Sequence, residues 1–219
     1  MTQRGETKLD DRTKKMDDKD KKLISILQKN GRTSLSEIGK ELEMSHVAVS
    51  KRLDRLVQSE IVQVTAGVNA KHLDAKVLFM GLETENMEIA EQIQEKYMDC
   101  PRLLMFAPVT GRYNVFAVMV AEDTWSLESI IGTCSMRTEP GVRRSESWFG
   151  NAPIEPKFLQ INLAPGTLGS SVSPCGRDCG ACKRYMAEKC VGCPPTEVYR
   201  GKLWATPNEG KKKPRKSKG

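Results

Sequence analysis

The chain has 219 residues, enough for two small domains and some additional segments. Lysine and arginine number 35 against 28 aspartate and glutamate residues, a net charge of +7 at pH 7, and there are only two histidines. No apolar stretch is long enough to cross a membrane, so we expect a soluble protein. So few histidines, without a recognisable pair of carboxylates, argue against an enzyme.

The excess of positive charge lies at the C-terminal end. Residues 200–219 contain eight basic groups and one acidic group, a difference equal to the net charge of the whole chain. Such a segment adds sequence-independent affinity for DNA, and its ordinary alternative is a solubilising extension. Because residues 1–16 and 201–219 contain few apolar side chains, we expect both segments to be disordered.

Residues 17–69 are predicted to form an N-terminal (winged) helix-turn-helix domain. A first helix is predicted within residues 17–30, followed by a stop at Gly31. Ser34 and Glu37 have the spacing of a capping box, in which the side chain of each residue accepts a hydrogen bond from the free backbone N–H of the other. The second helix therefore begins at residue 35.

The third predicted helix follows an N-cap at Ser45 and extends to about Ser59. Its buried stripe is predicted to contain Val49, Leu53, Leu56 and Val57. In a helix-turn-helix, the N-terminal part of such a helix enters the major groove. The residues expected to bind DNA here are the cap residue Ser45 and the four candidates for contact with base edges, His46, Ala48, Ser50 and Lys51. Arg52 and Arg55 are assigned to phosphate contacts or to local salt bridges. The alternative is a three-helix module whose charged residues form a solvated face.

Residues 76–150 are predicted to form a ferredoxin-like domain of βαββαβ order, which makes the fold class α+β. The predicted strands are residues 77–82, 103–106, 115–120 and 142–149, and the predicted helices are residues 88–98 and 125–134. Two helices on one side of the sheet leave its other, apolar face uncovered. We therefore expect a homodimer or a higher homo-oligomer.

Several motifs across residues 17–150 belong together. They are Asp17-Asp18-Lys19-Asp20, Leu23-Ile24-Ser25-Ile26-Leu27, Asn30-Gly31-Arg32, the spacing of Ser45, Val49, Arg52, Leu53 and Leu56, the pair Ile61-Val62, and the turn Thr110-Gly111-Arg112-Tyr113-Asn114. This set resembles the leucine-responsive (Lrp/AsnC, feast/famine) family of transcription regulators. The resemblance implies a sequence-specific regulator that binds double-stranded DNA.

The same resemblance implies dimers that hold an amino acid or another small molecule in clefts between the second domains. The effector-binding residues that it implies are Gly111, Tyr113 and Asn114. Two residues depart from the family pattern. Glu60 stands where the family usually has glycine after the recognition helix, and Asn114 stands where it usually has aspartate.

Residues 151–174, rich in proline, glycine and serine, are predicted to be a linker whose first half docks on the core and whose second half is mobile. Residues 175–200 are predicted to be a cysteine-rich, metal-binding module. Its five cysteines, of seven in the chain, are Cys175, Cys179, Cys182, Cys190 and Cys193. Two Cys-x-x-Cys pairs have the spacing that lets both thiolates bind one ion.

Two cofactors suit these cysteines, Zn2+ and a 4Fe–4S cluster. Four thiolates satisfy zinc, the commoner structural solution and slightly favoured here. The Cys-x3-Cys-x2-Cys spacing that begins at Cys175 is the spacing found in the iron–sulfur sites of radical enzymes. A disulfide framework is disfavoured, because an odd cysteine count and no secretory signal suit a reducing cytoplasm. A metal clip without a sensory role is an equal alternative within either case.

The function predicted from these features is sequence-specific transcription regulation that responds to a small molecule, to the state of the metal site, or to both. One rival is an iron–sulfur or metal redox protein with the helix-turn-helix as an accessory. The other is a protein-interaction module.

Overall fold

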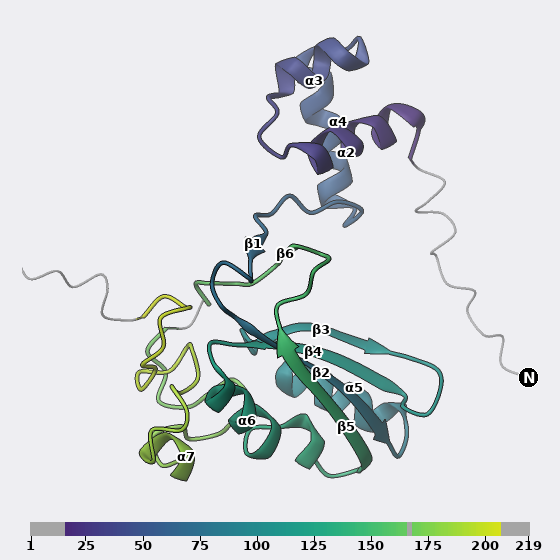
Figure 1. Cartoon of the computed structure of the whole chain (residues 1–219). Coiled ribbons are helices and arrows are strands. Elements are labelled where there is room, and N and C mark those ends of the chain that lie inside the picture. The colour runs from purple at the N-terminus through teal and green to yellow at the C-terminus, as the bar shows by residue number, and fades with distance from the viewer. Residues whose placement is uncertain (1–15, 166–167, 207–219) are drawn as a thin grey trace, which may run out of the picture. The chain divides into compact units, whose positions relative to one another are not determined.

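Figure 1 shows a computed structural model of the chain, which describes residues 16–165 and 168–206. The chain divides into two compact units, residues 1–66 and 67–219. Each unit has a hydrophobic core of its own. Among the described residues, every helix is too short or too polar to traverse a membrane.

The first unit contains the three predicted helices. They are α2 (Asp18–Lys29), α3 (Leu35–Leu42) and α4 (His46–Gln58). Each helix begins at a residue whose side chain accepts a backbone hydrogen bond, namely Asp17, Ser34 and Ser45. The buried core consists of Leu23, Ile38, Leu42, Val49 and Leu56. The capping patterns at Ser34 and Ser45 therefore placed the second and third helices within a residue or two of their observed bounds, and the first lies within its predicted range.

Two predicted features of this unit are wrong. Val57 is 44% exposed rather than buried, because the eight residues that separate it from Val49 turn it about 80° away around the helix. The described part of the unit contains no wing strand, since the chain after α4 leads to β1 (Val68–Asn69), which pairs with β6 (Phe158–Leu159) of the second unit. The compact first unit ends at residue 66, three residues before the predicted domain bound.

The second unit contains the predicted ferredoxin-like domain. Its elements in chain order are β2 (Lys76–Thr84), α5 (Met87–Tyr97), β3 (Leu103–Pro108), β4 (Val115–Ala121), α6 (Thr124–Gly132), the 3-10 turn η1 (Met136–Thr138) and β5 (Val142–Asn151). The strands form one antiparallel sheet in the order β3-β4-β2-β5. Helices α5 and α6 cover one face (Figure 1), where Leu78, Met80 and Leu82 are fully buried.

The other face of the sheet carries an apolar row across all four strands. In register, Met105 lies opposite Val118, Val118 opposite Phe79, and Phe79 opposite Trp148. Met105 is 44% exposed and Trp148 is 45% exposed, while the two central residues are half-buried. This face is therefore the apolar surface that the element order predicts, covered near Val120 by residues after β5 and left open along this row.

The segment after β5 is not the tether predicted from its composition. Its residues Ile161, Tyr199 and Trp204 are buried in a second core cluster, against Val120 of β4 and Ala70. The proline and glycine content describes local backbone geometry, whereas the buried aromatic and aliphatic side chains decide that the segment packs. Trp204 lies within the expected disordered tail, and only residues 207–219 of that tail lie outside the described residues.

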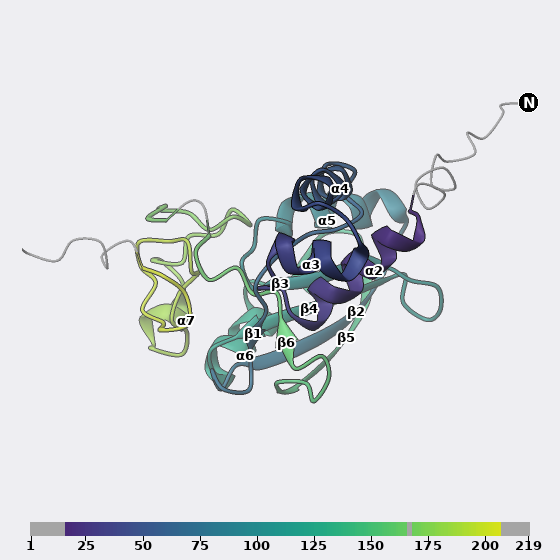
Figure 2. The same ribbon diagram turned by 90° about the horizontal axis from the view of Figure 1, so that it is seen from above.

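The cysteine-rich module, which includes the short helix α7 (Lys183–Met186), packs beside α6 (Figures 1 and 2). Arg184 Nε donates to Ser129 Oγ at 2.5 Å, and the Ser129 hydroxyl also contacts the carbonyl of Lys189 at 2.9 Å. Arg102, which precedes β3, donates to the carbonyl of Gly192 at 3.0 Å. The prediction that a mobile linker isolates the module is therefore wrong.

Candidate DNA-binding surface and cysteine site

The turn between α3 and α4 positions the start of the recognition helix. A Cβ atom on Gly39 would lie 2.6 Å from the carbonyl oxygen of Met44, so the close approach requires glycine. Glu43 ends α3 in the left-handed region, with φ of 53°. Ser45 Oγ then accepts a hydrogen bond from the backbone N–H of Ala48 at 3.2 Å. Gly39 was not singled out from the sequence, although a glycine inside a short helix is an available signal.

The first half of α4 presents a mixed polar and apolar surface. His46 and Lys51 are exposed, and Ala48 and Ser50 are half-exposed. Val47 is 50% exposed, and sequence reasoning missed it because an apolar residue on a helix is ordinarily read as core. An exposed apolar group at this place suits contact with the methyl group of thymine, while the polar groups suit base edges.

The cationic residues in the second half of α4 are held by α2. Arg52 donates to Asp17 and to Asp20, both at 2.7 Å, and Arg55 donates to Asp20 at 2.5 Å. Asp20 is fully buried. These contacts correspond to the local salt bridges that the sequence left as one of two alternatives.

The two arginines also set the charge state of Asp20. Burial favours the neutral carboxyl, but hydrogen bonds from Arg52, from the Asp17 backbone and from Arg55 outweigh it and lower the pKa of Asp20. The same contacts raise the pKa of Arg52, with the hydrogen bond to Asp20 contributing most. The carboxylate is therefore ionised at neutral pH and joins the two helices as a buried charged group.

The chain leaves α4 through a residue that departs from the family pattern. Glu60 has φ of 57°, in the left-handed region where glycine is favoured. The backbone N–H groups of Ile61 and Val62 donate to the carbonyl of Leu56 at 3.0 and 3.3 Å. The exit thus keeps a glycine-type conformation in spite of the glutamate.

Six of the seven cysteines surround one small cavity of about 40 Å³. Four come from the predicted module, Cys175, Cys179, Cys190 and Cys193, and two come from the ferredoxin-like domain, Cys100 and Cys134. The remaining predicted ligand, Cys182, lines a larger cavity of about 450 Å³ that shares Cys134, Cys179, Cys190 and Gly192 with the first. Folding therefore gathers the cysteines of two distant segments.

The protonation states of these thiols differ. A hydrogen bond from Cys193 lowers the pKa of Cys179 to about 7 and raises that of Cys193. Burial raises the pKa of Cys100, and raises that of Cys134 to about 12. Cys100 and Cys134 are thus neutral thiols at neutral pH unless a cation displaces their protons.

Among the described residues, no three histidine, cysteine, aspartate or glutamate side chains meet closely enough to hold one metal ion. The cysteine side chains line the two cavities, and Cys179 and Cys193 are close enough to share a hydrogen bond. Arg102 is buried at the edge of the smaller cavity. Burial lowers its pKa, but the charge and hydrogen bonds of Glu122 and the charges of Cys193 and Cys100 together outweigh burial and raise it. A permanent positive charge therefore lies beside the cysteines.

Comparison with known proteins agrees with the first two parts of the chain. A model of the AsnC-type helix-turn-helix domain matches residues 16–57. The transcriptional regulator LrpA of Pyrococcus horikoshii is 33% identical over 121 residues, which are 53% of this chain and 83% of LrpA. The chain belongs to the Lrp/AsnC family. It is therefore a helix-turn-helix transcription regulator that binds DNA, as the sequence predicted.

Other members and solved structures give the same result. The Lrp/AsnC chain is 25% identical to the regulator LysM of Saccharolobus solfataricus over 55% of this chain and 91% of LysM. Escherichia coli AsnC superposes with a TM-score of 0.54 at 18% identity, over 64% of this chain and 94% of AsnC. A Neisseria meningitidis transcriptional regulator in complex with L-Met superposes with a TM-score of 0.55 at 20% identity, over 65% and 94%. These structures confirm the fold.

The turn that carries the expected effector residues is occupied by contacts within this Lrp/AsnC chain. The Asn114 amide donates to Thr84 Oγ1 and to the Thr84 carbonyl at 3.0 and 3.1 Å, and accepts from the Thr84 N–H at 2.8 Å. Tyr113 lies over Gly81, where a Cβ atom would be 2.6 Å from the ring, and its hydroxyl contacts Glu146 at 2.6 Å. Gly111 has open space beside it. Effector binding at this turn stays a prediction.

Proposed function

We propose that this regulator recognises its operator through the first half of α4, acts as a homodimer, and carries a metal on its C-terminal cysteines. The observation that carries operator recognition is the division of α4 into two parts. His46, Val47 and Lys51 are exposed, whereas Arg52 and Arg55 are tied to α2. The first turns are therefore available for base contacts, and the later arginines stabilise the fold of the unit.

The test compares operator DNA, selected from a random pool, with random DNA. Replacing Ser50 or Lys51 by alanine is expected to weaken operator binding by about 1–3 kcal/mol and to leave binding to random DNA nearly unchanged. Lys22→Ala, which removes an equal charge from the exposed surface of α2, serves as the matched control. Equal losses on both DNAs for Lys51→Ala would assign that side chain to phosphate contacts instead.

Support for the homodimer comes from the apolar row that crosses the face of the sheet opposite α5 and α6. A contiguous row containing Met105, Phe79 and Trp148 is unfavourable in water and is buried when two copies pack face to face. Trp148→Glu is expected to produce monomers in light-scattering measurements. Phe149→Glu is the matched control, because its neighbour Phe149 is 57% exposed on the opposite face of β5. A dimer that survives Trp148→Glu and is lost with Phe149→Glu would place the interface elsewhere.

Support for a bound metal comes from the gathering of thiols around the two cavities. Metal analysis of the full chain purified without oxygen should find metal in the wild type, and the Cys179→Ser, Cys190→Ser double variant should lack it. Amino-acid effector binding rests on the family and on the L-Met complex of the structural neighbour. A change of melting temperature with added amino acids would support such binding, and none across the common amino acids would count against it.

A further inference from the structure

The strongest feature left unexplained is the pair of cysteines in the ferredoxin-like domain. Cys100 follows α5 and Cys134 follows α6, 34 residues apart and in no sequence motif. Both line the cavity that the module's cysteines surround. Cys134 also lines the larger cavity, together with Cys179 and Cys190. The domain and the module therefore contribute thiols to one site.

The arrangement of the thiols suits a cluster of metal atoms better than one ion. A zinc ion holds four sulfur atoms at about 2.3 Å, which brings them within about 3.8 Å of one another. No such group of three ligands exists among the described side chains. In an iron–sulfur cluster each cysteine binds a different iron atom, so the sulfurs stand apart around a volume. Six cysteines from the domain and the module line the smaller cavity, more than the four that one zinc ion binds.

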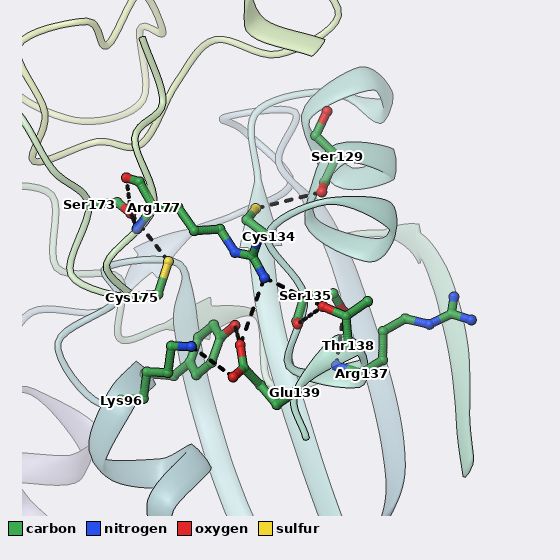
Figure 3. Close-up of polar contacts among 11 residues, drawn as sticks. Lys96, Ser129, Cys134, Ser135, Arg137, Thr138, Glu139, Ser173, Cys175 and Arg177 are labelled. Carbon is green, nitrogen blue, oxygen red and sulfur yellow. Dashed lines mark hydrogen bonds and ion pairs between the residues drawn. The ribbon is translucent and has the colours of Figure 1, made fainter. Parts of the chain in front are cut away.

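Two buried donors without partners point to the same group. Ser126 of α6 is 1% exposed, lines the smaller cavity, and its hydroxyl has no hydrogen-bond partner among the described residues. The Nε of Arg177, a residue that lines the larger cavity, is also buried without a partner. Figure 3 shows the Arg177 side chain passing Cys134 on its way to Glu139. Thiolate and sulfide sulfurs would accept such hydrogen bonds.

The charges around the site also favour an anionic group. A cluster held by thiolates carries net negative charge, which must be compensated when it is buried. Arg102 lies at the smaller cavity, and Arg177, Lys183 and Arg184 line the larger one. Arg102 and Arg184 also join the module to the domain through hydrogen bonds with Gly192 and Ser129. The same cations thus hold the two parts together and stabilise the anion.

We propose that a 4Fe–4S cluster binds between the module and the ferredoxin-like domain, with Cys134 of the domain as a ligand beside Cys179, Cys190 and Cys193 of the module. Each ligating thiol releases its proton to water when it binds iron. This inference rests on the proposed metal binding and adds the identity of the group and its ligand from the domain. The cluster then joins the C-terminal segment to the domain covalently through iron, beyond the contacts between their side chains.

The test uses the full chain, purified without oxygen, with iron, sulfide and zinc analysis and a visible spectrum. The wild type should contain iron and sulfide and absorb broadly in the visible range, whereas Cys134→Ser should lose most of both. Ile130→Val is the control, because it shortens another side chain that lines the same cavity without removing a thiol. This variant should keep its iron and sulfide. Circular dichroism and operator binding show whether Cys134→Ser remains folded.

A second variant keeps the proposal testable if Cys134→Ser does not fold. Ser126→Ala should keep the iron and sulfide content but lower the reduction potential, because it removes a hydrogen bond to cluster sulfur. A wild type that holds zinc alone, with zinc retained in Cys134→Ser, overturns this inference and leaves the proposed metal binding intact. A wild type without any metal overturns both. An unchanged potential in Ser126→Ala overturns the assigned place of the cluster.

Discussion

Asp20 offers the sharpest test of how the DNA-binding unit is held together. The carboxylate is fully buried and accepts hydrogen bonds from Arg52 at 2.7 Å, Arg55 at 2.5 Å and the backbone of Asp17 at 3.1 Å. Each hydrogen bond to a charged group contributes about 1.5–3 kcal/mol, and removing one partner of a buried ion pair costs about 3–5 kcal/mol. The side chains of Arg52 and Arg55 are 25% and 51% exposed, so water compensates part of the loss. We expect Asp20→Asn to lower the free energy of unfolding by about 2–4 kcal/mol.

The assay is hydrogen exchange of the amides in α2 and α4 of the full chain, which reports on this unit alone. Asp18→Asn is the matched control, because Asp18 lies on the same turn, is 91% exposed and, among the described residues, pairs only with Lys21 at 3.2 Å. Its effect should stay within about 0.5 kcal/mol. Equal exchange rates in the two variants would refute the view that Asp20 joins the helices.

Acidification should reduce the difference between wild type and Asp20→Asn. The pKa of Asp20 in the folded chain is lowered, so its ionised form contributes stability above the ordinary aspartate pKa of about 3.9. That contribution disappears as pH falls through the folded pKa, since the folded state must then bind a proton. The variant has no such group, so its stability relative to wild type should recover at the acid end. A difference that stays constant down to pH values well below the ordinary pKa would contradict the assignment.

Three further results are expected. Glu60→Gly should stabilise the first unit by about 1 kcal/mol, because glycine tolerates the left-handed φ of 57°. Glu60→Ala keeps the backbone strain and should not stabilise the unit. Hydrogen exchange of the amides in α2 and α4 checks both variants. Asn114→Asp should lower the free energy of unfolding of the second unit by about 1–3 kcal/mol, since a carboxylate cannot donate a hydrogen bond to the Thr84 carbonyl. The control is Asn162→Asp, at an exposed position. Equal thermal unfolding of the two variants would contradict this role of the Asn114 amide. Removing residues 207–219 should weaken binding to all DNA sequences and leave the footprint unchanged. The slope of log affinity against log salt concentration should become shallower by about 0.9 for each phosphate that the segment neutralises. An unaltered slope would mean that the basic segment does not bind DNA.

The sequence by itself determined the features that depend on neighbouring residues. Capping pairs such as Ser34 with Glu37 set the helix starts, since donor and acceptor are three residues apart. The order of apolar runs and turns set the βαββαβ domain, and strand pairing followed from it. The spacing of the C-terminal cysteines predicted a metal-binding module at residues 175–200, and its metal stays a prediction. Each of these signals is contained in a short window of the chain.

The tertiary structure alone decided which distant residues meet. Asp20 contacts Arg52 and Arg55, more than thirty residues away, and these ion pairs are the salt-bridge alternative that the sequence could not choose over phosphate contacts. Cys134 and the module's cysteines share a cavity because α6 and the C-terminal segment pack together, and no spacing in the sequence records that contact. Burial of Trp204 made a packed segment of residues that composition alone describes as a tail. Such contacts depend on which faces of the elements pack against one another, and that choice is made by the free energy of the whole core rather than by any local pattern.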